Sequence, residues 1–152
     1  MKKIIILIAV AGFTSLGVYT AWRTHNGSTD FDTFYYAARH VIDGVPLYAP
    51  IKSVSPYIYP PFFACLISPL ALLSLEVASF LWYILSLVLF AVSMAISAIL
   101  IFGHTDIRRI WDSVLFLPKA MFLVLAGAIF IDNISLLQSN ILLFFAVVTG
   151  LY

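Results

Sequence analysis

The chain of 152 residues is 63% hydrophobic and only 10% charged, with a mean hydropathy of +1.08. This composition excludes a water-soluble globular domain and predicts an integral membrane protein. A net charge of +1 provides no basic surface for nucleic acid, and the single cysteine, Cys65, excludes a disulfide bond within the chain and a metal site built from cysteines.

Lys2 and Lys3 precede an uncharged run over residues 4–22. The run has about the 20 residues that a transmembrane helix needs, and it is longer than the apolar core of a cleaved signal peptide. We therefore predict an uncleaved signal anchor. Because positive residues stay on the cytoplasmic side, we expect the N-terminus in the cytoplasm and the loop 23–60 on the extracytoplasmic side.

The loop 23–60 is the one long polar segment, and it contains a predicted short helix over 32–43. The apolar face of this helix would consist of Phe34, Ala38, Val41 and Ile42. Gly44 and Pro46 predict its end. We expect the helix to lie in the membrane interface with its apolar face towards lipid. The side chains turned towards water or a cleft would be Tyr36, Arg39 and His40.

The next segment, 61–75, is apolar but short and contains Pro69, which favours a re-entrant or juxtamembrane helix that does not cross the membrane. Further transmembrane helices are predicted over 77–103, 113–131 and 133–152. This arrangement places Arg108 and Arg109 in the cytoplasm, as the positive-inside rule requires.

The predicted architecture is an all-α integral membrane protein with about four transmembrane helices, inserted as a single multi-pass unit in the plasma (cytoplasmic) membrane. The last apolar segment reaches Tyr152 without a capping residue or a polar tail. We therefore expect the chain 1–152 to be the amino-terminal fragment of a longer protein.

Asp30 and Asp32 follow the first predicted span, at the level where lipid head groups meet protein. A carboxylate there can accept a proton from a sugar hydroxyl, orient that hydroxyl or hold a cation. The alternative is a structural role, in which Thr29 or Asp30 caps the following helix and Asp32 lies near the positive end of its dipole. Position alone favours the capping role.

The polar loop also contains Tyr35, Tyr36, Tyr48, Tyr57 and Tyr59. Tyrosines commonly form interfacial belts, and stacking on a sugar ring or head group is the functional alternative. Arg39 is expected on the helix face of Asp32 and Tyr36, where it either pairs with Asp32 or binds a phosphate through its planar donors. The ion pair is favoured. The three histidines lack ligand spacing and predict no metal site.

Several motifs occur in a fixed order along the chain. D-F-x-x-F-Y-Y-A-A-R begins at Asp30 and is followed by G-x-P-L-Y, Y-x-Y-P-P-F-F and P-L-A-L-L. A later stretch, LLQSNILLFF, begins at Leu136. Together they resemble membrane glycosyltransferases of family 87, within the GT-C superfamily. The later stretch is similar to a G-Q-x-N-x-L-L element of that family, although Leu137 stands where glycine is usual.

The resemblance implies an inverting enzyme that moves a hexose or pentose from a polyprenyl-phosphate donor to a lipid or glycan acceptor on the extracytoplasmic side. Asp30 would be the catalytic base or would orient the acceptor. Asp32 would be a supporting acid that contacts the acceptor or a divalent cation, and no cofactor is certain. The implied substrate-binding residues are Tyr36, Arg39, Tyr48, Tyr59, Gln138 and Asn140. The helices that complete the donor site would lie outside this chain.

Two other classes stay open at this point. A noncatalytic membrane subunit, or a degenerate copy of the enzyme, would use the polar loop only as an interfacial anchor. A transporter fragment would need charged or glycine-interrupted sites near the membrane midplane, which the positions of Gly103 and Gly127 do not favour.

Overall fold

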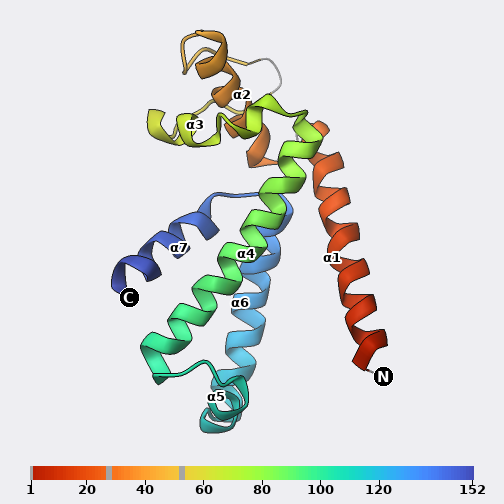
Figure 1. Cartoon of the computed structure of the whole chain (residues 1–152), viewed down its shortest axis with the longest axis vertical. Coiled ribbons are helices and arrows are strands. Elements are labelled where there is room, and N and C mark those ends of the chain that lie inside the picture. Colours follow the sequence, from red (N-terminus) through yellow and green to blue (C-terminus); the bar gives the residue numbers. More distant parts are fainter. Residues whose placement is uncertain (1, 27–28, 52–53) are drawn as a thin grey trace. The chain divides into compact units, whose positions relative to one another are not determined.

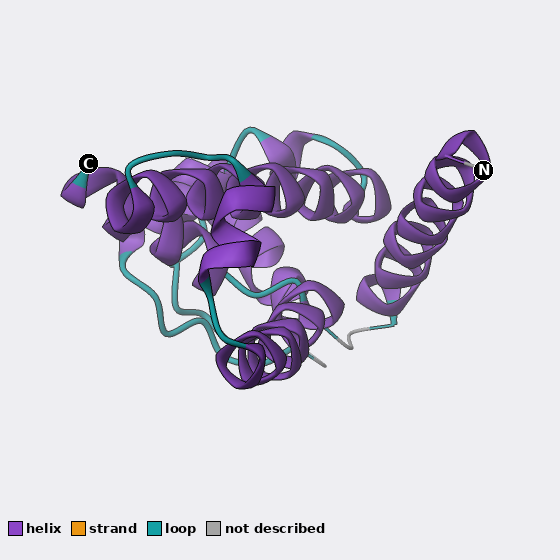
Figure 2. Ribbon diagram, turned by 90° about the horizontal axis from the view of Figure 1, so that it is seen from below, coloured by secondary structure: helices purple, strands orange, loops and turns teal. Residues whose placement is uncertain are grey.

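The computed structural model describes residues 2–26, 29–51 and 54–152, and within these ranges the chain is entirely helices and connecting loops (Figures 1 and 2). The all-α prediction is therefore confirmed. In chain order the elements are α1 (Lys2–His25), α2 (Asp30–Asp43), α3 (Pro61–Ile67), the 3-10 helix η1 (Leu70–Leu72), α4 (Leu75–Phe102), α5 (Ile107–Ser113), α6 (Phe116–Leu136) and α7 (Asn140–Leu151).

Helix α4 is long and apolar enough to cross a membrane, with 28 residues and a mean hydropathy of 2.7 over its 18-residue window. It corresponds to the span predicted over 77–103. Two shorter apolar helical stretches, Val124–Leu136 and Asn140–Leu151, fall in the last two predicted spans. That these stretches and α1 also cross the membrane stays a prediction.

The boundary between α6 and α7 differs from the predicted one. The predicted spans 113–131 and 133–152 meet at Asp132, but Asp132 lies inside α6, and the chain turns at 137–139 instead. Pro118 lies in the first turn of α6, where its missing N–H has no intrahelical partner to lose. It therefore does not interrupt the helix.

The chain divides into two compact units, which are described separately. The second unit contains Leu85–Ile134 and Ser139–Tyr152. Within it the rings of Phe90 and Phe130 stack with their centroids 4.2 Å apart. Helix α5 begins at a capped N-terminus, where the Asp106 carboxylate accepts hydrogen bonds from the backbone N–H groups of Arg108 and Arg109.

The first unit contains Met1–Ile84 and Ser135–Gln138, and with them almost all the predicted site residues. In this unit α1 packs closely against the first turns of α4. The hydroxyl of Tyr83 donates to the carbonyl of Phe13 at 2.8 Å, and the Tyr83 ring lies over Gly17. A Cβ atom at Gly17 would come within 2.8 Å of that ring, so the glycine permits the close approach of the two helices.

Helix α2 has the predicted end but begins two residues earlier than expected. Thr29 is extended and precedes the first helical residue, whereas Gly44 adopts a left-handed conformation with φ +67°. The N–H of Val45 donates to the carbonyl of His40 at 2.9 Å, and the Gly44 N–H turns back to the same carbonyl. Glycine favours such an ending because it has no Cβ atom to clash.

The predicted apolar face of α2 is buried in its first part and exposed in its last turn. Phe31, Phe34 and Ala38 are buried, whereas Val41 and Ile42, placed on the apolar face by their spacing, are exposed. The reason is tertiary packing: the N-terminal half of α2 lies against α3 and η1, and its last turn extends past them. The segment 61–75 is broken at Ser68–Pro69, and the seven-residue α3 is too short to cross a bilayer.

Candidate functional site

An aromatic cluster fixes α2, which carries both aspartates, to α3 and α4. Its members are Phe31, Phe34, Tyr59, Phe63 and Trp82. The Phe34 ring meets Tyr59 and Phe63 edge to face, with centroids 4.9 and 5.1 Å away. Phe31 stacks on Trp82 with centroids 5.6 Å apart. Because these rings come from four separate segments, the N-terminal turns of α2 have a rigid base.

Asp32 is a buried carboxylate in this mostly apolar setting, with 3% of its surface exposed. Its Oδ1 accepts hydrogen bonds from the backbone N–H of Thr33 at 2.6 Å and from the Thr33 hydroxyl at 3.3 Å. Burial raises the pKa of Asp32 above its usual value, and the negative charge of Asp30 raises that pKa further. Among the described residues no cation pairs with Asp32.

Asp30 is half-buried at the first position of α2, two residues before Asp32. Thr29 occupies the N-cap position with an extended backbone, but its side chain does not cap the helix. The Thr29 hydroxyl makes no capping bond and instead shares a hydrogen bond of 2.9 Å with the buried hydroxyl of Thr24 at the end of α1. The first turn of α2 therefore carries two carboxylates of different environments, one accessible and one buried.

Arg39 does not pair with Asp32, which corrects the favoured prediction. Its guanidinium lies 3.6 Å from the carboxylate of Asp43, one turn further along α2, and it donates to the carbonyl of Ala71 at 3.3 Å. Asp32 lies on the buried face of α2, while the Arg39 side chain keeps 42% of its surface exposed. The two residues therefore do not share the face that their spacing suggested.

The predicted binding tyrosines have unequal exposure. Tyr36 and Tyr59 are half-buried, and Tyr48 is exposed with its hydroxyl donating to the Tyr59 carbonyl at 3.2 Å. Tyr57 lies beneath them, with its ring centroid 5.9 Å from Tyr48 and 5.7 Å from Tyr59. The Tyr57 hydroxyl donates to the Pro60 carbonyl at 2.9 Å, and burial raises its pKa to about 12.

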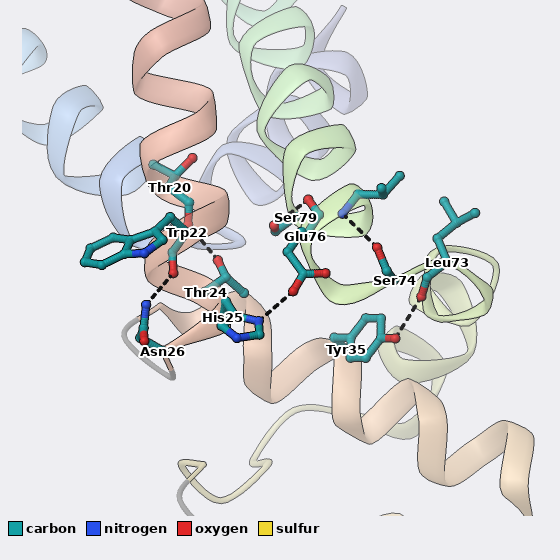
Figure 3. A network of polar contacts seen from close by, with 11 residues as sticks. Thr20, Trp22, Thr24, His25, Asn26, Tyr35, Leu73, Ser74, Glu76 and Ser79 are labelled. Atoms are coloured by element: carbon teal, nitrogen blue, oxygen red, sulfur yellow. Dashed lines mark hydrogen bonds and ion pairs between the residues drawn. The ribbon is translucent and has the colours of Figure 1, made fainter.

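Polar contacts also connect the end of α1 to the start of α4, and α2 to the loop that precedes α4, as Figure 3 shows. His25 Nδ1 and a carboxylate oxygen of Glu76 lie 2.6 Å apart. The Tyr35 hydroxyl donates to the Leu73 carbonyl at 2.8 Å. Side chains of α1 and α2 therefore both hold the segment 73–76, at and just before the start of α4.

Gln138 belongs to the first unit through the turn that follows α6, whereas Asn140 begins α7 in the second unit. Two donors hold this turn. The Arg23 guanidinium donates to the Ser135 carbonyl at 3.2 Å, and the Trp82 indole N–H donates to the Leu137 carbonyl at 3.1 Å. Gln138 is thus in the same compact unit as Asp30 and Asp32, although residues 33 to 137 separate them in the sequence.

No three His, Cys, Asp or Glu side chains gather into a metal site within the described ranges. A shallow apolar hollow of about 480 Å³ lies on α1, lined by Thr14, Ser15, Val18, Tyr19 and Trp22. It contains none of the predicted site residues.

Sequence reasoning missed Trp82 and the strained turn that it supports. Trp82 stands in the apolar run of a predicted span, where a tryptophan gives no sign of a polar partner. Leu137 did carry a signal, because it occupies the position where the resembling element has glycine. Its φ of +53° is the left-handed conformation that glycine tolerates best.

The described residues form an all-helical protein in which α4 is long and apolar enough to cross a membrane. Glycosyltransferase family 87 matches residues 57–152, and the chain belongs to this family. The resemblance stated from the motifs is therefore confirmed. The matched range begins at Tyr57, so Asp30 and Asp32 lie before it.

A curated relative is the polyprenol-phosphate-mannose-dependent alpha-(1-2)-phosphatidylinositol mannoside mannosyltransferase of Mycobacterium tuberculosis. It is 34% identical over 121 residues, an alignment that covers 67% of this chain and 28% of the relative. The chain thus matches less than a third of that relative's length. No solved structure matches the chain.

Proposed function

We propose that the chain supplies the acidic part of the active site of a membrane glycosyltransferase. The enzyme transfers a hexose or pentose from a polyprenyl-phosphate donor to a lipid or glycan acceptor on the extracytoplasmic side. Membership of family 87 supports the reaction class, and the name of the mycobacterial relative supports a polyprenol-phosphate donor. The observation that carries the assignment to α2 is Asp32, a buried carboxylate without a cation partner in the described residues.

In the proposed step an acceptor hydroxyl attacks the anomeric carbon of the donor sugar. A carbon–oxygen bond forms there, the bond to the phosphate oxygen breaks, and polyprenyl phosphate leaves. Asp30, the accessible carboxylate, takes the hydroxyl proton, which is the usual role of a general base. Asp32 supports Asp30 as a second acid, and burial together with the negative charge of Asp30 raises the pKa of Asp32.

The remaining side chains would hold the two substrates. Arg39 keeps part of its guanidinium exposed beyond its bonds to Asp43 and Ala71, and planar donors of this kind suit the phosphate of the donor. Tyr36, Tyr48 and Tyr59 offer aromatic faces for a sugar ring. Gln138 and Asn140 are the remaining proposed substrate-binding residues. Asp32 could also contact a divalent cation, and the assay tests this by comparing transfer with and without added divalent metal.

The test compares transfer from a radiolabelled polyprenyl-phosphate sugar in native membranes that carry the chain or its variants. Asp30→Asn removes the base and should lower transfer by about a hundredfold or more. The matched control is Asp112→Asn, an exposed carboxylate on α5, which should stay within about twofold of wild type. Full transfer by Asp30→Asn, at equal amounts of folded protein, would overturn the site assignment.

A noncatalytic membrane subunit is the second candidate, because the range that matches family 87 begins at Tyr57 and leaves Asp30 and Asp32 outside it. In that case transfer in the same membranes would depend on the presence of the chain but would not change with Asp30→Asn or Asp32→Asn. The two variants therefore separate the candidates.

A further inference from the structure

Trp82 touches both segments that carry the proposed site. One face of its ring packs on Phe31, at a centroid distance of 5.6 Å and an interplanar angle of 28°. Phe31 is completely buried and stands between Asp30 and Asp32 in the sequence. The position of the indole ring therefore helps to fix the turn of α2 from which the two carboxylates project.

The edge of the same indole ring supports the turn before Gln138. Its N–H donates to the carbonyl of Leu137 at 3.1 Å, and both residues are almost completely buried. Within the described ranges Leu137 is the one non-glycine residue with a positive φ, at +53°. A leucine adopts this conformation reluctantly, so the turn needs a bond from outside to hold it.

We propose that Trp82 is a positioning residue that sets the distance between the aspartates of α2 and the Gln138 turn. It does so without contacting substrate. Its ring holds Phe31, and its N–H holds the carbonyl next to Gln138. The expected effect on transfer rests on the proposed function, whereas the role of Trp82 in holding Phe31 and the Leu137 carbonyl does not.

The decisive variant is Trp82→Phe, which keeps an aromatic face for Phe31 and removes the N–H donor. Hydrogen exchange is measured on the full chain in lipid nanodiscs. Exchange in segment 135–139 should rise by about fivefold to tenfold, as expected for loss of one buried hydrogen bond, while exchange in 30–34 should stay unchanged. A general loss of stability would raise exchange in both segments, and that result would overturn the inference.

Leu137→Gly provides a rescue test, because glycine adopts the left-handed conformation without support. In this background Trp82→Phe should change exchange in 135–139 by no more than about twofold. An equally large effect in both backgrounds would contradict the role of the N–H bond. The matched control is Trp22→Phe, an exposed tryptophan on α1, which should match wild type in exchange and in transfer.

Transfer measurements in native membranes complete the test. Trp82→Phe should lower transfer by about fivefold to tenfold, and in the Leu137→Gly background its effect should again shrink to about twofold. Wild-type transfer by Trp82→Phe, together with the altered exchange, would overturn the positioning role. If Asp30→Asn leaves transfer unchanged, the proposed function fails instead, and the exchange results still decide whether Trp82 holds the turn.

Discussion

Asp32 combines two properties that rarely serve stability alone. It is a carboxylate buried in an aromatic setting, and its bonds come from one neighbouring residue, Thr33. Transfer of a charged group out of water costs free energy that two local hydrogen bonds only partly offset. Perturbed carboxylates of this kind are concentrated at functional sites, which favours a chemical role for the first turn of α2.

The raised pKa of Asp32 predicts how Asp32→Asn changes stability with pH. Folding favours the protonated carboxyl, so its contribution is fully present below the unfolded pKa of 3.8 and is lost as the pH rises through the higher folded pKa. Asparagine is neutral throughout. The variant should therefore gain stability over wild type as the pH rises above 3.8, until the carboxyl of wild-type Asp32 is ionised in the folded protein.

Thermal unfolding of the two proteins in the same nanodiscs, across this pH range, measures the gain. A difference in melting temperature that narrows as the pH rises would show that the ionised carboxylate is stabilised by a partner. That outcome would contradict the account of Asp32.

At the residue scale the sequence drew attention to the aspartates and tyrosines of the polar loop, because polar groups stand out in an apolar chain, and their role in a site stays a prediction. It did not identify the partner of Arg39. Spacing along one helix suggested Asp32, whereas the partner is Asp43, because Asp32 is buried by tertiary packing that local spacing does not contain.

At the scale of elements, the contact of α1 with α4 depends on the lack of a side chain at Gly17. A Cβ atom there would meet the rings of Tyr83 and Phe80 at 2.8 and 2.9 Å. Gly17→Ala should therefore destabilise the protein by about 1–3 kcal/mol through overpacking. Gly12→Ala on the same helix is the control, since a Cβ atom at Gly12 meets nothing within 4 Å.

Chemical or thermal unfolding in nanodiscs compares the two alanine variants with wild type. Gly12→Ala should be neutral or slightly stabilising, because alanine has the higher helix propensity. Equal effects of the two substitutions would mean that α1 does not pack on Tyr83 as described.

Element ends were predictable where a residue dictates backbone geometry. Gly44 predicted the end of α2 correctly, because glycine adopts the left-handed backbone conformation of a helix C-terminus more easily than other residues. The turn between α6 and α7 was misplaced because Asp132 and Asn133 are polar, and polarity suggested a loop. The actual turn is at Leu137, whose conformation depends on a hydrogen bond from Trp82, a residue distant in the sequence. Local patterns cannot contain such a contact.

At the scale of the whole molecule, the account depends on which side of the membrane each loop faces. The positive-inside rule places the loop that carries Asp30 outside and the connection before α5 inside, where Arg108 and Arg109 follow. A lipid-borne sugar on the extracytoplasmic side can meet the aspartates only in this orientation.

Labelling of single cysteines tests this orientation most directly. In a Cys65→Ser background, Ile58→Cys, at a residue with 80% of its surface exposed, is treated in intact spheroplasts with a membrane-impermeant maleimide. The account predicts rapid labelling of Ile58→Cys from outside. Thr105→Cys, exposed before α5, should be labelled only after the membrane is permeabilised. The reverse pattern would place the aspartates in the cytoplasm and contradict the proposed extracytoplasmic transfer.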